Sequence, residues 1–440
     1  MQEFINIKTI FENDFQRTID NLSKLYSDIN SLQSIIYELI KDELLIDNKL
    51  RDKKIFIKPN WVRHYVNDQD DICLRTNDNI LIALVQLLLE QNPKSILIGD
   101  APLQGCVWEK MLSNDFFSRI DMLSQKYAIP IVVKDFRRTR MDIENNKITK
   151  ECNPLSEYII FDLGKSSYLE PISTNDNNFR VTCYDPNRLA ESHNHGVHKY
   201  CITRELFEAD IIISVPKLKT HQKTGITGAL KNLVGINGDK DFLPHHRIGG
   251  IEQGGDCYPG KNYFRFWSEK LLDIANQHIG ETQSYLLKKS ASFLWKISNP
   301  QPVHQLAAGW YGNDTCWRMV MDLNKIAIYG KKDGTLSVNP ERVLYSLCDG
   351  IIGGQGDGPL NPDPLPLGII TFSNNSIITD VCAATLMGFD INKIYLLKNS
   401  NLEINHENIT FILNNELSNM KQLHSFKIKT VPPPGWNNYL

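Results

Sequence analysis

The residues best suited to chemistry lie close together in residues 214–240, SVPKLKTHQKTGITGALKNLVGINGDK. This stretch combines one histidine, His221, with closely spaced lysines and glycines. Histidine titrates near neutral pH and suits proton transfer, whereas lysine ammonium groups and glycine amides suit the binding of anions. We therefore predict a catalytic or binding loop here; the alternative is a solvated basic loop.

Two side chains of this stretch are predicted to be catalytic, His221 as an acid or base and Lys231 as the anchor of a cofactor or a phosphate. A lysine can attach a group covalently only when a fraction of its amino groups is neutral. This requires burial or neighbouring cations, which lower the pKa of the lysine. The neighbouring lysines supply such cations, and they would equally hold a phosphate by charge alone. The predicted ligand-binding residues of the stretch are Lys217, Lys219, Gly225, Thr227, Gly228 and Asn232.

Strands are expected to position this loop. Residues 209–215 form a short, β-branched apolar run, which predicts a buried strand ending directly before the loop. Earlier in the chain, residues 54–58 and 95–99 predict two further strands, and residues 77–91 predict an apolar helix between them. This strand–helix–strand order predicts a parallel sheet.

Polar residues follow these strands at the ends where open α/β sheets bind their ligands. Lys58 and Asn60 stand at the end of one strand and are predicted to bind the ligand. Asp100 ends the next strand and is predicted to be catalytic; the alternative is that it caps the following helix.

Histidines outside the loop are candidate metal ligands, because imidazole is a common one. His193 and His195 alternate as they would on one face of a strand, and the alternative is an exposed turn without metal. His245 and His246 lie in residues 241–259, a segment without secondary-structure periodicity whose length is typical of a functional loop.

Two later segments add ligand-binding candidates. Arg318 lies among aromatic residues, where a guanidinium group suits a carboxylate or phosphate; the alternative is an ion pair with Asp314 or Asp322. Gly356 and Asp357 lie in a second glycine-rich stretch, and a carboxylate such as Asp357 or Asp100 also suits a divalent metal.

The whole pattern predicts an α/β protein with two α/β domains of parallel or mixed sheets, a helical insertion, and a site in the cleft between the domains. The helical insertion is expected to bury Trp267, Leu286 and Phe293, and residues 326–329 and 394–397 are predicted as strands. The predicted boundaries are a helical segment over 1–52, an N-terminal α/β domain over 53–260, the helical insertion over 261–324 and a C-terminal α/β domain over 325–440.

Composition narrows the classes of function. A net charge of −3 gives no electrostatic support for nucleic-acid binding. The 9 cysteines are scattered, with no C-x-x-C pair, which argues against a local zinc or iron–sulfur motif and favours free thiols in a reducing compartment. No run is long and apolar enough to cross a membrane and the N-terminus does not resemble a signal peptide, so we expect a cytoplasmic protein.

Several motifs, taken together, resemble the domain of unknown function (DUF) family 362. They are IKPN, IGDAP, PKLKTHQKTGITGALKNLVGINGDK, LPHHR, WYGNDTCWR, DGIIGGQGDGP and ITDVCAATLMGFD, in this order from about residue 54 to residue 390. Many members of that family carry cysteine motifs for four-iron–four-sulfur clusters. This chain lacks those motifs, so no iron–sulfur cluster is expected.

The spacing His221, Gly225, Gly228 and Lys231 also resembles the loop of nickel-dependent lactate racemase. That resemblance implies an acid/base role for the histidine, attachment of a nickel-pincer nucleotide to the lysine, and nickel binding by a later histidine, here His245 or His246. This chain departs from the racemases at Lys58-Pro59-Asn60, where they carry an arginine, and at Asp100, where they carry a histidine.

Three functions remain open from the sequence. The first is an isomerase, epimerase or racemase that acts on a small anionic hydroxy compound, carboxylated or phosphorylated. The second is a transferase or ligase that uses magnesium and phosphate, with Asp100 and Asp357 near the ion. The third is a ligand-binding protein without catalysis, in which His221 and Lys231 are dispensable for binding.

Overall fold

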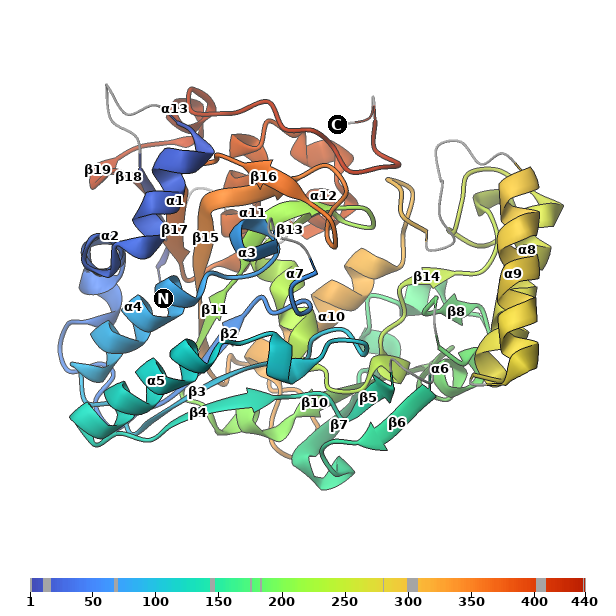
Figure 1. Cartoon of the computed structure of the whole chain (residues 1–440), viewed down its shortest axis with the longest axis horizontal. Coiled ribbons are helices and arrows are strands. Elements are labelled where there is room, and N and C mark those ends of the chain that lie inside the picture. The colour runs from blue at the N-terminus through green and yellow to red at the C-terminus, as the bar shows by residue number, and fades with distance from the viewer. Residues whose placement is uncertain are drawn as a thin grey trace.

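A 12-stranded mixed sheet is the largest sheet among the described residues of the computed structural model (Figure 1). The structure describes residues 2–10, 17–66, 70–142, 147–174, 176–182, 184–279, 281–298, 308–400, 409–437 and 439. The main strand order is β19-β18-β1-β17-β15-β11-β2-β3-β4. Both predicted α/β segments contribute to this one sheet, since β11 and β15 are neighbours in it. The predicted α/β class is confirmed.

The parallel part of the sheet contains the predicted strands. β11 pairs in parallel with both β2 and β15, and β2 continues through β3 to β4. The uncharged, β-branched interior of β11 is buried on both faces, as a central parallel strand requires. The bounds are β2 Lys54–Pro59, β3 Ser95–Asp100, β4 Ile131–Asp135, β11 Ile211–Val215 and β15 Val343–Gln355.

The other edge of the sheet joins the two ends of the chain. β17 runs antiparallel to β15, and β1 lies between β17 and β18. The helical prediction for residues 1–52 is therefore wrong for Glu3–Thr9, whose residues alternate between more and less buried positions as a half-covered strand does. The bounds are β1 Glu3–Thr9, β16 Asp363–Leu365, β17 Ile369–Ser373, β18 Ile409–Leu413 and β19 Glu416–Leu417.

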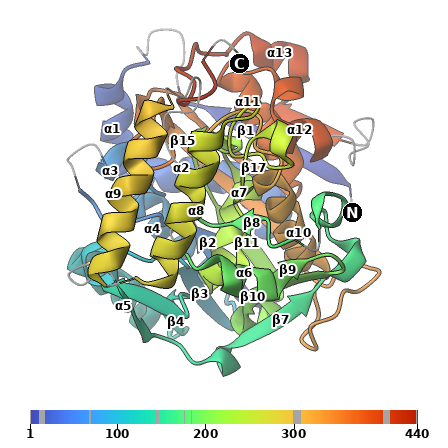
Figure 2. The ribbon, with the colours of Figure 1, turned by 90° about the vertical axis from the view of Figure 1, so that its right-hand side faces the viewer.

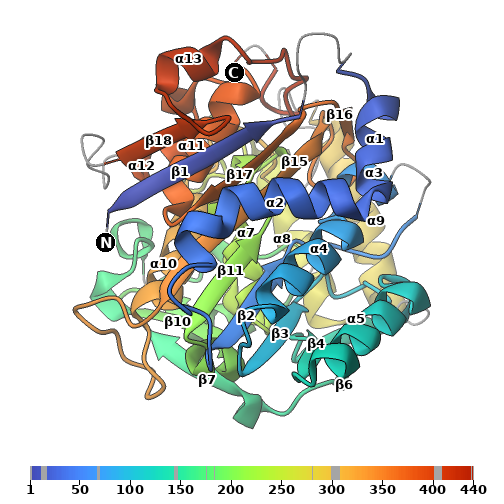
Figure 3. The ribbon, with the colours of Figure 1, turned by 90° about the vertical axis from the view of Figure 1, so that its left-hand side faces the viewer.

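Helices cover both faces of the sheet. Figure 3 shows α2, α4 and α5 lying across one face, where Ile55 and Ile57 of β2 point into their core. Phe56, between them, belongs to the core on the opposite face, together with residues of α7, α10 and α11. The bounds are α1 Ile19–Ser27, α2 Ile29–Leu44, α3 Asp70–Cys73, α4 Asp78–Leu89, α5 Asn114–Tyr127, α7 Ala229–Asn232, α10 Cys316–Tyr329, α11 Ser376–Leu386, α12 Tyr395–Ser400 and α13 Met420–His424.

Two short strands predicted near the C-terminus are wrong. Residues 326–329 are the last turn of α10, and residues 395–397 lie in α12. Short apolar runs do not distinguish a strand from a buried helix by periodicity alone, and here the surrounding packing selects helix.

The lysine-rich segment after β11 is a hairpin rather than an open loop. β12 (Lys217–His221) pairs with β13 (Gly225–Thr227) and also with β15, and every residue of β12 is buried. The alternative of a solvated basic loop is therefore wrong. Smaller sheets lie beside it, formed by β5 Thr139–Asp142, β6 Lys147–Glu151, β7 Tyr158–Asp162, β8 Phe179–Arg180, β9 His193–Asn194, β10 Val197–Thr203 and β14 His246–Arg247.

The helical insertion lies at one side of the molecule. α8 (Tyr263–Gln277) and α9 (Thr282–Ile297) lie side by side (Figures 1 and 2). Trp267, Leu286 and Phe293 were predicted as core residues but are 59%, 58% and 63% exposed. α6 (Pro186–Ser192) packs near this region. Among the described residues, no helix combines the length and the apolar character needed to cross a membrane.

Candidate functional site

A cavity lined by several lysines lies at the carboxyl ends of β2, β3 and β11, where the chain order in the sheet reverses. β3 and β4 extend from β2 in one direction, while β11 and β15 extend in the other. Such a switch point is where open α/β sheets bind ligands. This cavity, called the basic cavity below, has a volume of about 420 Å³, and its polar lining is Lys58, Asn60, Asp100, Lys219, His221, Gln222, Lys223, Thr227, Lys231, Asn232, Lys240, His245, Asp357 and Asn361.

The floor of the basic cavity contains a buried ion pair between neighbouring strands. Lys58 Nζ lies 2.7 Å from Asp100 Oδ1, and both side chains are almost completely buried. The other oxygen of Asp100 accepts a hydrogen bond from the Trp61 amide at 2.7 Å. Burial lowers the pKa of Lys58, and the charge of Asp100 opposes that shift. Asp100 is thus occupied by protein partners, which suits a positioning role better than metal binding.

The backbone of Gly235 packs directly against the ion pair of Lys58 and Asp100. A Cβ atom at Gly235 would lie 1.8 Å from Asp100 Oδ1 and 2.7 Å from Lys58 Nζ. Its carbonyl also accepts a hydrogen bond from the Ala101 amide at 3.0 Å. Only a residue without a side chain allows the backbone to approach the ion pair so closely.

β12 places Lys219 and His221 on the basic cavity but turns Lys217 away. Lys217 Nζ instead binds Asp349 Oδ2 at 3.0 Å and the Tyr26 hydroxyl at 2.8 Å, and it does not line the cavity. The register of β12 against β15 shifts between Lys217 and Lys219, which breaks the alternation expected of a regular strand. The structure therefore contradicts the ligand-binding prediction for Lys217.

Lys219 keeps an ammonium group in a fully buried position. Its Nζ donates to Asn60 Oδ1 at 2.8 Å and to the Leu74 carbonyl. Burial, together with the nearby charges of Lys217 and Lys231, lowers the pKa of Lys219 to about 7. Lys219 is consequently a cation that gains or loses its proton near neutral pH.

His221 presents a hydrogen-bond donor to the basic cavity. Its Nδ1 accepts a hydrogen bond from the Lys223 amide at 3.0 Å, so in the neutral ring the proton is on Nε2. Burial, followed by the charges of Lys231 and Lys223, lowers the pKa of His221 well below its usual value. The ring is therefore neutral at physiological pH.

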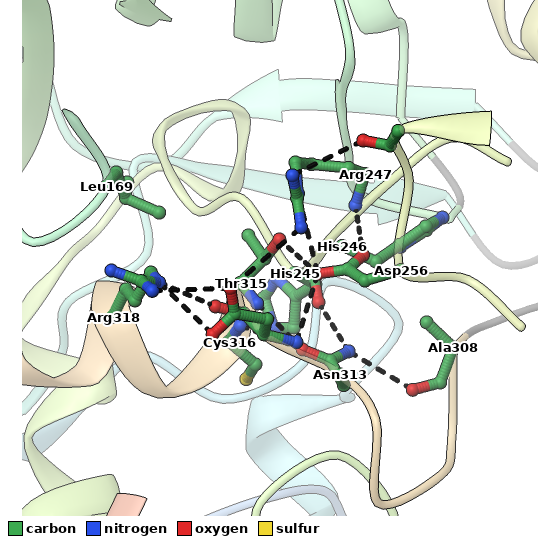
Figure 4. Close-up of polar contacts among 12 residues, drawn as sticks. Leu169, His245, His246, Arg247, Asp256, Ala308, Asn313, Thr315, Cys316 and Arg318 are labelled. Carbon is green, nitrogen blue, oxygen red and sulfur yellow. Dashed lines mark hydrogen bonds and ion pairs between the residues drawn. The ribbon is translucent and has the colours of Figure 1, made fainter. Parts of the chain in front are cut away.

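His245 presents the opposite group. Its Nδ1 donates to the Leu243 carbonyl at 2.6 Å, which leaves the lone pair of a neutral ring on Nε2. Burial and the charges of Lys223 and Lys231 lower the pKa of His245 well below its usual value. Figure 4 shows how the backbone is held: Asn313 Nδ2 donates to the His245 carbonyl at 2.9 Å. A base in a fixed orientation results.

Several buried polar atoms on the cavity wall have no hydrogen-bond partner among the described residues. These atoms are Trp61 Nε1, Lys223 Nζ, Thr227 Oγ1 and Asn232 Oδ1. Leaving a buried polar atom unpaired costs about 1–3 kcal/mol each. These atoms are therefore available to hydrogen-bond with water or with a polar ligand in the basic cavity.

Two further lysines reach the basic cavity from the segment after β13. Lys240 Nζ donates to the Ala101 carbonyl at 2.8 Å, and burial lowers the pKa of Lys240 to about 8. Lys231, on the short helix α7, lines the same cavity, and no hydrogen bond or ion pair of its Nζ is found in the described part of the chain. Lys231 therefore has a free ammonium group to offer a ligand.

Some predicted glycines serve the fold rather than the ligand. Gly225 adopts a φ of 76°, in the left-handed region, beside the side chain of Ile394. A Cβ at Gly228 would lie 2.0 Å from Asp380 Oδ1, whose carboxylate accepts from the first amides of α7. Gly356 adopts a φ of 69°, and none of these three glycines lines the basic cavity.

Other predicted site residues lie away from the basic cavity. Arg318 forms an ion pair with Asp314 at 3.2 Å, which is the alternative to ligand binding that the sequence offered for this residue. His193 Nε2 donates to the Phe242 carbonyl at 3.0 Å, and Nδ1 of the exposed His195 lies 3.2 Å from Glu170 Oε1. His246 points away from its neighbour His245, toward Glu269 at 3.5 Å.

Sequence reasoning missed several residues of the lining. Lys223 and Lys240 were within the predicted stretch but were not chosen, and the lysine density there was the only signal for them. Trp61 directly follows Lys58-Pro59-Asn60 at the end of β2, so its position at a strand end was also readable. Nothing in the sequence indicated the apolar contributions of Val181, Tyr184, Leu243 and Leu360.

The fold and site define an α/β protein with a buried, lysine-rich cavity at a sheet switch point. Residues 167–385 match a domain of unknown function, DUF362. Over this region, which includes β12, β13, α7 and β15, the chain belongs to the DUF362 family, as its motifs predicted.

Comparison with other proteins adds little beyond the family. A crystal structure of a protein from Thermotoga maritima aligns with a TM-score of 0.34 and 10% sequence identity. The alignment covers 88% of this chain but only 59% of that one. No curated protein matches the sequence.

Proposed function

We propose that this protein is an enzyme that binds a small anionic hydroxy compound, carboxylated or phosphorylated, and moves a proton at the carbon that bears the hydroxyl group. The observation that carries the proposal is the pairing of His221 and His245 on a cavity rich in lysine. One neutral ring offers N–H and the other offers a lone pair. An isomerase, epimerase or racemase needs both groups.

The lysines suit the anionic part of such a substrate. Lys219, Lys223, Lys231 and Lys240 line the cavity, whereas its acids, Asp100 and Asp357, already accept hydrogen bonds from Lys58 and Gln222. A carboxylate or phosphate would pair with Lys223 and Lys231. It would also supply hydrogen-bond partners to the buried polar atoms of the cavity lining that lack them. The occupied state of Asp100 supports an isomerase better than a transferase that holds magnesium on this carboxylate.

The roles of the two histidines follow from their tautomers. His245 Nε2 would accept the proton from carbon, and His221 Nε2–H would donate a hydrogen bond to the oxygen on which negative charge develops. A neutral imidazole can serve as such a donor when its surroundings keep it from protonating. Burial, followed by the charges of the nearby lysines, lowers the pKa of both rings and so provides these surroundings.

A covalent nickel-pincer nucleotide on Lys231 is a second, alternative form of the isomerase proposal, in which His245 would be a metal ligand and not the base for the carbon proton. The free Nζ of Lys231 and the lone pair of His245 fit an attachment point and a metal ligand, respectively. When bound, such a group would supply a hydride acceptor. Intact mass and nickel content of protein from its own host, beside Lys231→Ala, test this form: the unmodified mass without nickel would rule it out.

Solvent exchange tests the proton transfer itself. The full chain is incubated in D₂O with a panel of 2-hydroxy acids, sugar acids and sugar phosphates, and deuterium at the carbinol carbon is followed by mass spectrometry. We expect exchange into at least one compound, reduced at least 100-fold in His245→Gln. Absence of exchange across the panel, or equal exchange in His245→Gln, would contradict the proposal.

A further inference from the structure

A second cluster of potential ligand atoms lies behind the basic cavity. It consists of His246 on β14, Cys257 in the loop that follows, and Glu269 on α8. One ligand atom from each residue lies within 4.8 Å of the other two, and all three side chains are buried. None of the three lines the basic cavity, although His246 directly follows His245.

The contacts within this cluster are incomplete as hydrogen bonds. His246 Nε2 and Glu269 Oε1 are 3.5 Å apart, beyond the usual range for such a bond. Glu269 Oε1 and His246 Nδ1 have no hydrogen-bond partner in the part of the chain that the structure describes. Among the described residues, the unpartnered carboxylate oxygen of Glu269 on α8 therefore faces Nε2 of His246 on β14 without forming a regular hydrogen bond.

The separation matches that of two ligands of one metal ion. Nitrogen and oxygen ligands lie roughly 2.0–2.2 Å from zinc, so two of them at a tetrahedral angle lie roughly 3.3–3.6 Å apart. A thiolate, an imidazole and a carboxylate together suit zinc or a similar transition metal and do not suit magnesium or calcium.

We propose that His246, Cys257 and Glu269 bind one zinc ion, with a water molecule as the fourth ligand. A cavity of about 10 Å³ adjoins His246 and Glu269, which is room for roughly one water. On binding, the Cys257 thiol loses its proton to solvent and its sulfur forms the bond to zinc. No electron is transferred.

The ligands are already held by the surrounding backbone. Glu269 Oε2 accepts a hydrogen bond from the Gly249 amide at 2.8 Å, which leaves Oε1 for the metal. The Cys257 amide donates to the Gly249 carbonyl at 3.0 Å. In the same loop, Asp256 accepts from the Arg247 amide at 2.6 Å, as Figure 4 shows.

The zinc ion would have a structural role. It would join α8 to β14 and to the loop around Cys257, and so fix the backbone next to His245. Stability of the holoprotein should therefore depend on the metal, whereas the metal would not touch a ligand in the basic cavity.

Metal loading of the full-length protein tests this proposal. The protein is exposed to Zn²⁺, freed of excess by gel filtration, and its zinc is counted by mass spectrometry. We expect one zinc per chain in the wild type and in the matched control Cys382→Ser, which changes another buried free cysteine. Cys257→Ser and Glu269→Gln should each bind zinc at least tenfold more weakly, and a chelator should lower the melting temperature of the wild type only when zinc was loaded.

Spectroscopy on the wild type covers the case in which a variant does not fold. Cobalt in place of zinc should show a thiolate-to-cobalt charge-transfer band, and X-ray absorption of the zinc protein should show one sulfur among the ligands. A wild type that retains no zinc after loading, or a zinc ion without a sulfur ligand, would overturn the proposal. His245→Gln should keep its zinc, which separates this site from the acid/base function of the basic cavity.

Discussion

His221 and His245 border the same cavity with opposite hydrogen-bonding groups, because each ring is fixed at Nδ1 by a different backbone partner. The Lys223 amide donates to His221, whereas the Leu243 carbonyl accepts from His245. Two neutral imidazoles, one a donor and one an acceptor, are thereby set among lysines. This relationship defines the site more sharply than any single residue does.

The buried ion pair beneath the cavity should be essential for stability. Asp100→Asn would leave the Lys58 ammonium buried without a countercharge, and removing one partner of such a pair costs about 3–5 kcal/mol. Urea unfolding measures the free energy directly. Asp357→Asn is the control, because that cavity carboxylate has no lysine partner among the described ion pairs, and an equal loss in both variants would contradict the assignment.

Gly235 should not tolerate a side chain. A Cβ there would overlap Asp100 Oδ1, so we expect Gly235→Ala to lose roughly 1–3 kcal/mol of stability through the shift of the ion pair. Gly105→Ala is the matched control, since a Cβ at that position meets nothing within 4 Å. The melting temperatures of the two variants are compared. Similar values would contradict the prediction and would show that the ion pair can move to make room for a methyl group.

Removing the charge of Lys223 should have opposite effects on the stability of the ligand-free protein and on the binding of an anion. The buried Nζ of Lys223 has no hydrogen-bond partner among the residues that the structure describes, so Lys223→Met should stabilise the ligand-free protein by about 1–3 kcal/mol while weakening the binding of phosphate. Lys217→Met should instead destabilise the protein, because it breaks the ion pair with Asp349. Thermal unfolding with and without inorganic phosphate distinguishes them, and a destabilised Lys223→Met would refute this role.

Stability of the ligand-free protein should rise with pH. Folding lowers the pKa of Lys219 to about 7 from an unfolded value of roughly 10.4, so the unfolded chain binds more protons between these limits. The free energy of unfolding should therefore increase from about pH 7 toward pH 10 through this group. Urea titrations across this range should show a smaller rise in Lys219→Met than in Lys332→Met, which alters an exposed lysine.

Anion binding should have the opposite pH dependence. A phosphate ion is held by the protonated lysines, so its affinity should fall as the pH rises through the values of about 7 for Lys219 and about 8 for Lys240. Calorimetry in buffers of different ionisation enthalpy should reveal proton uptake on binding near pH 8. Affinity that is constant from pH 6 to pH 9 would exclude these two lysines as the anion's partners.

Local sequence patterns predicted the main strands and the cluster of site residues at their ends. Short apolar runs closed by Lys58-Pro59-Asn60, by Asp100 and by the lysine-rich stretch indicated parallel strands, and the carboxyl ends of parallel strands share one edge of a sheet. For this reason His221, Lys231 and Asp100 are expected near one another from the sequence, whereas His245 or His246 was indicated only by the resemblance to lactate racemase. The family was indicated separately, by the resemblance of its motifs and their order.

Tertiary structure alone decided which residues of these segments face the ligand. A shift in register between Lys217 and Lys219 turned one lysine toward Asp349 and left the other on the cavity, and alternation cannot predict such a shift. The neighbours His245 and His246 were separated in the same way, one toward the basic cavity and one toward Glu269.

The helical insertion and the first strand also show which features follow from local sequence and which depend on tertiary contacts. Periodicity placed α8 and α9 correctly, but it could not tell whether an apolar side chain such as Trp267 has anything to pack against. β1 became a strand because β17 and β18 offered it two partners from the far end of the chain. The sequence by itself determined the elements and the chemistry available at their ends, since those depend on neighbours along the chain. Pairing, orientation and burial depend on contacts between distant segments, and only the tertiary structure decided them.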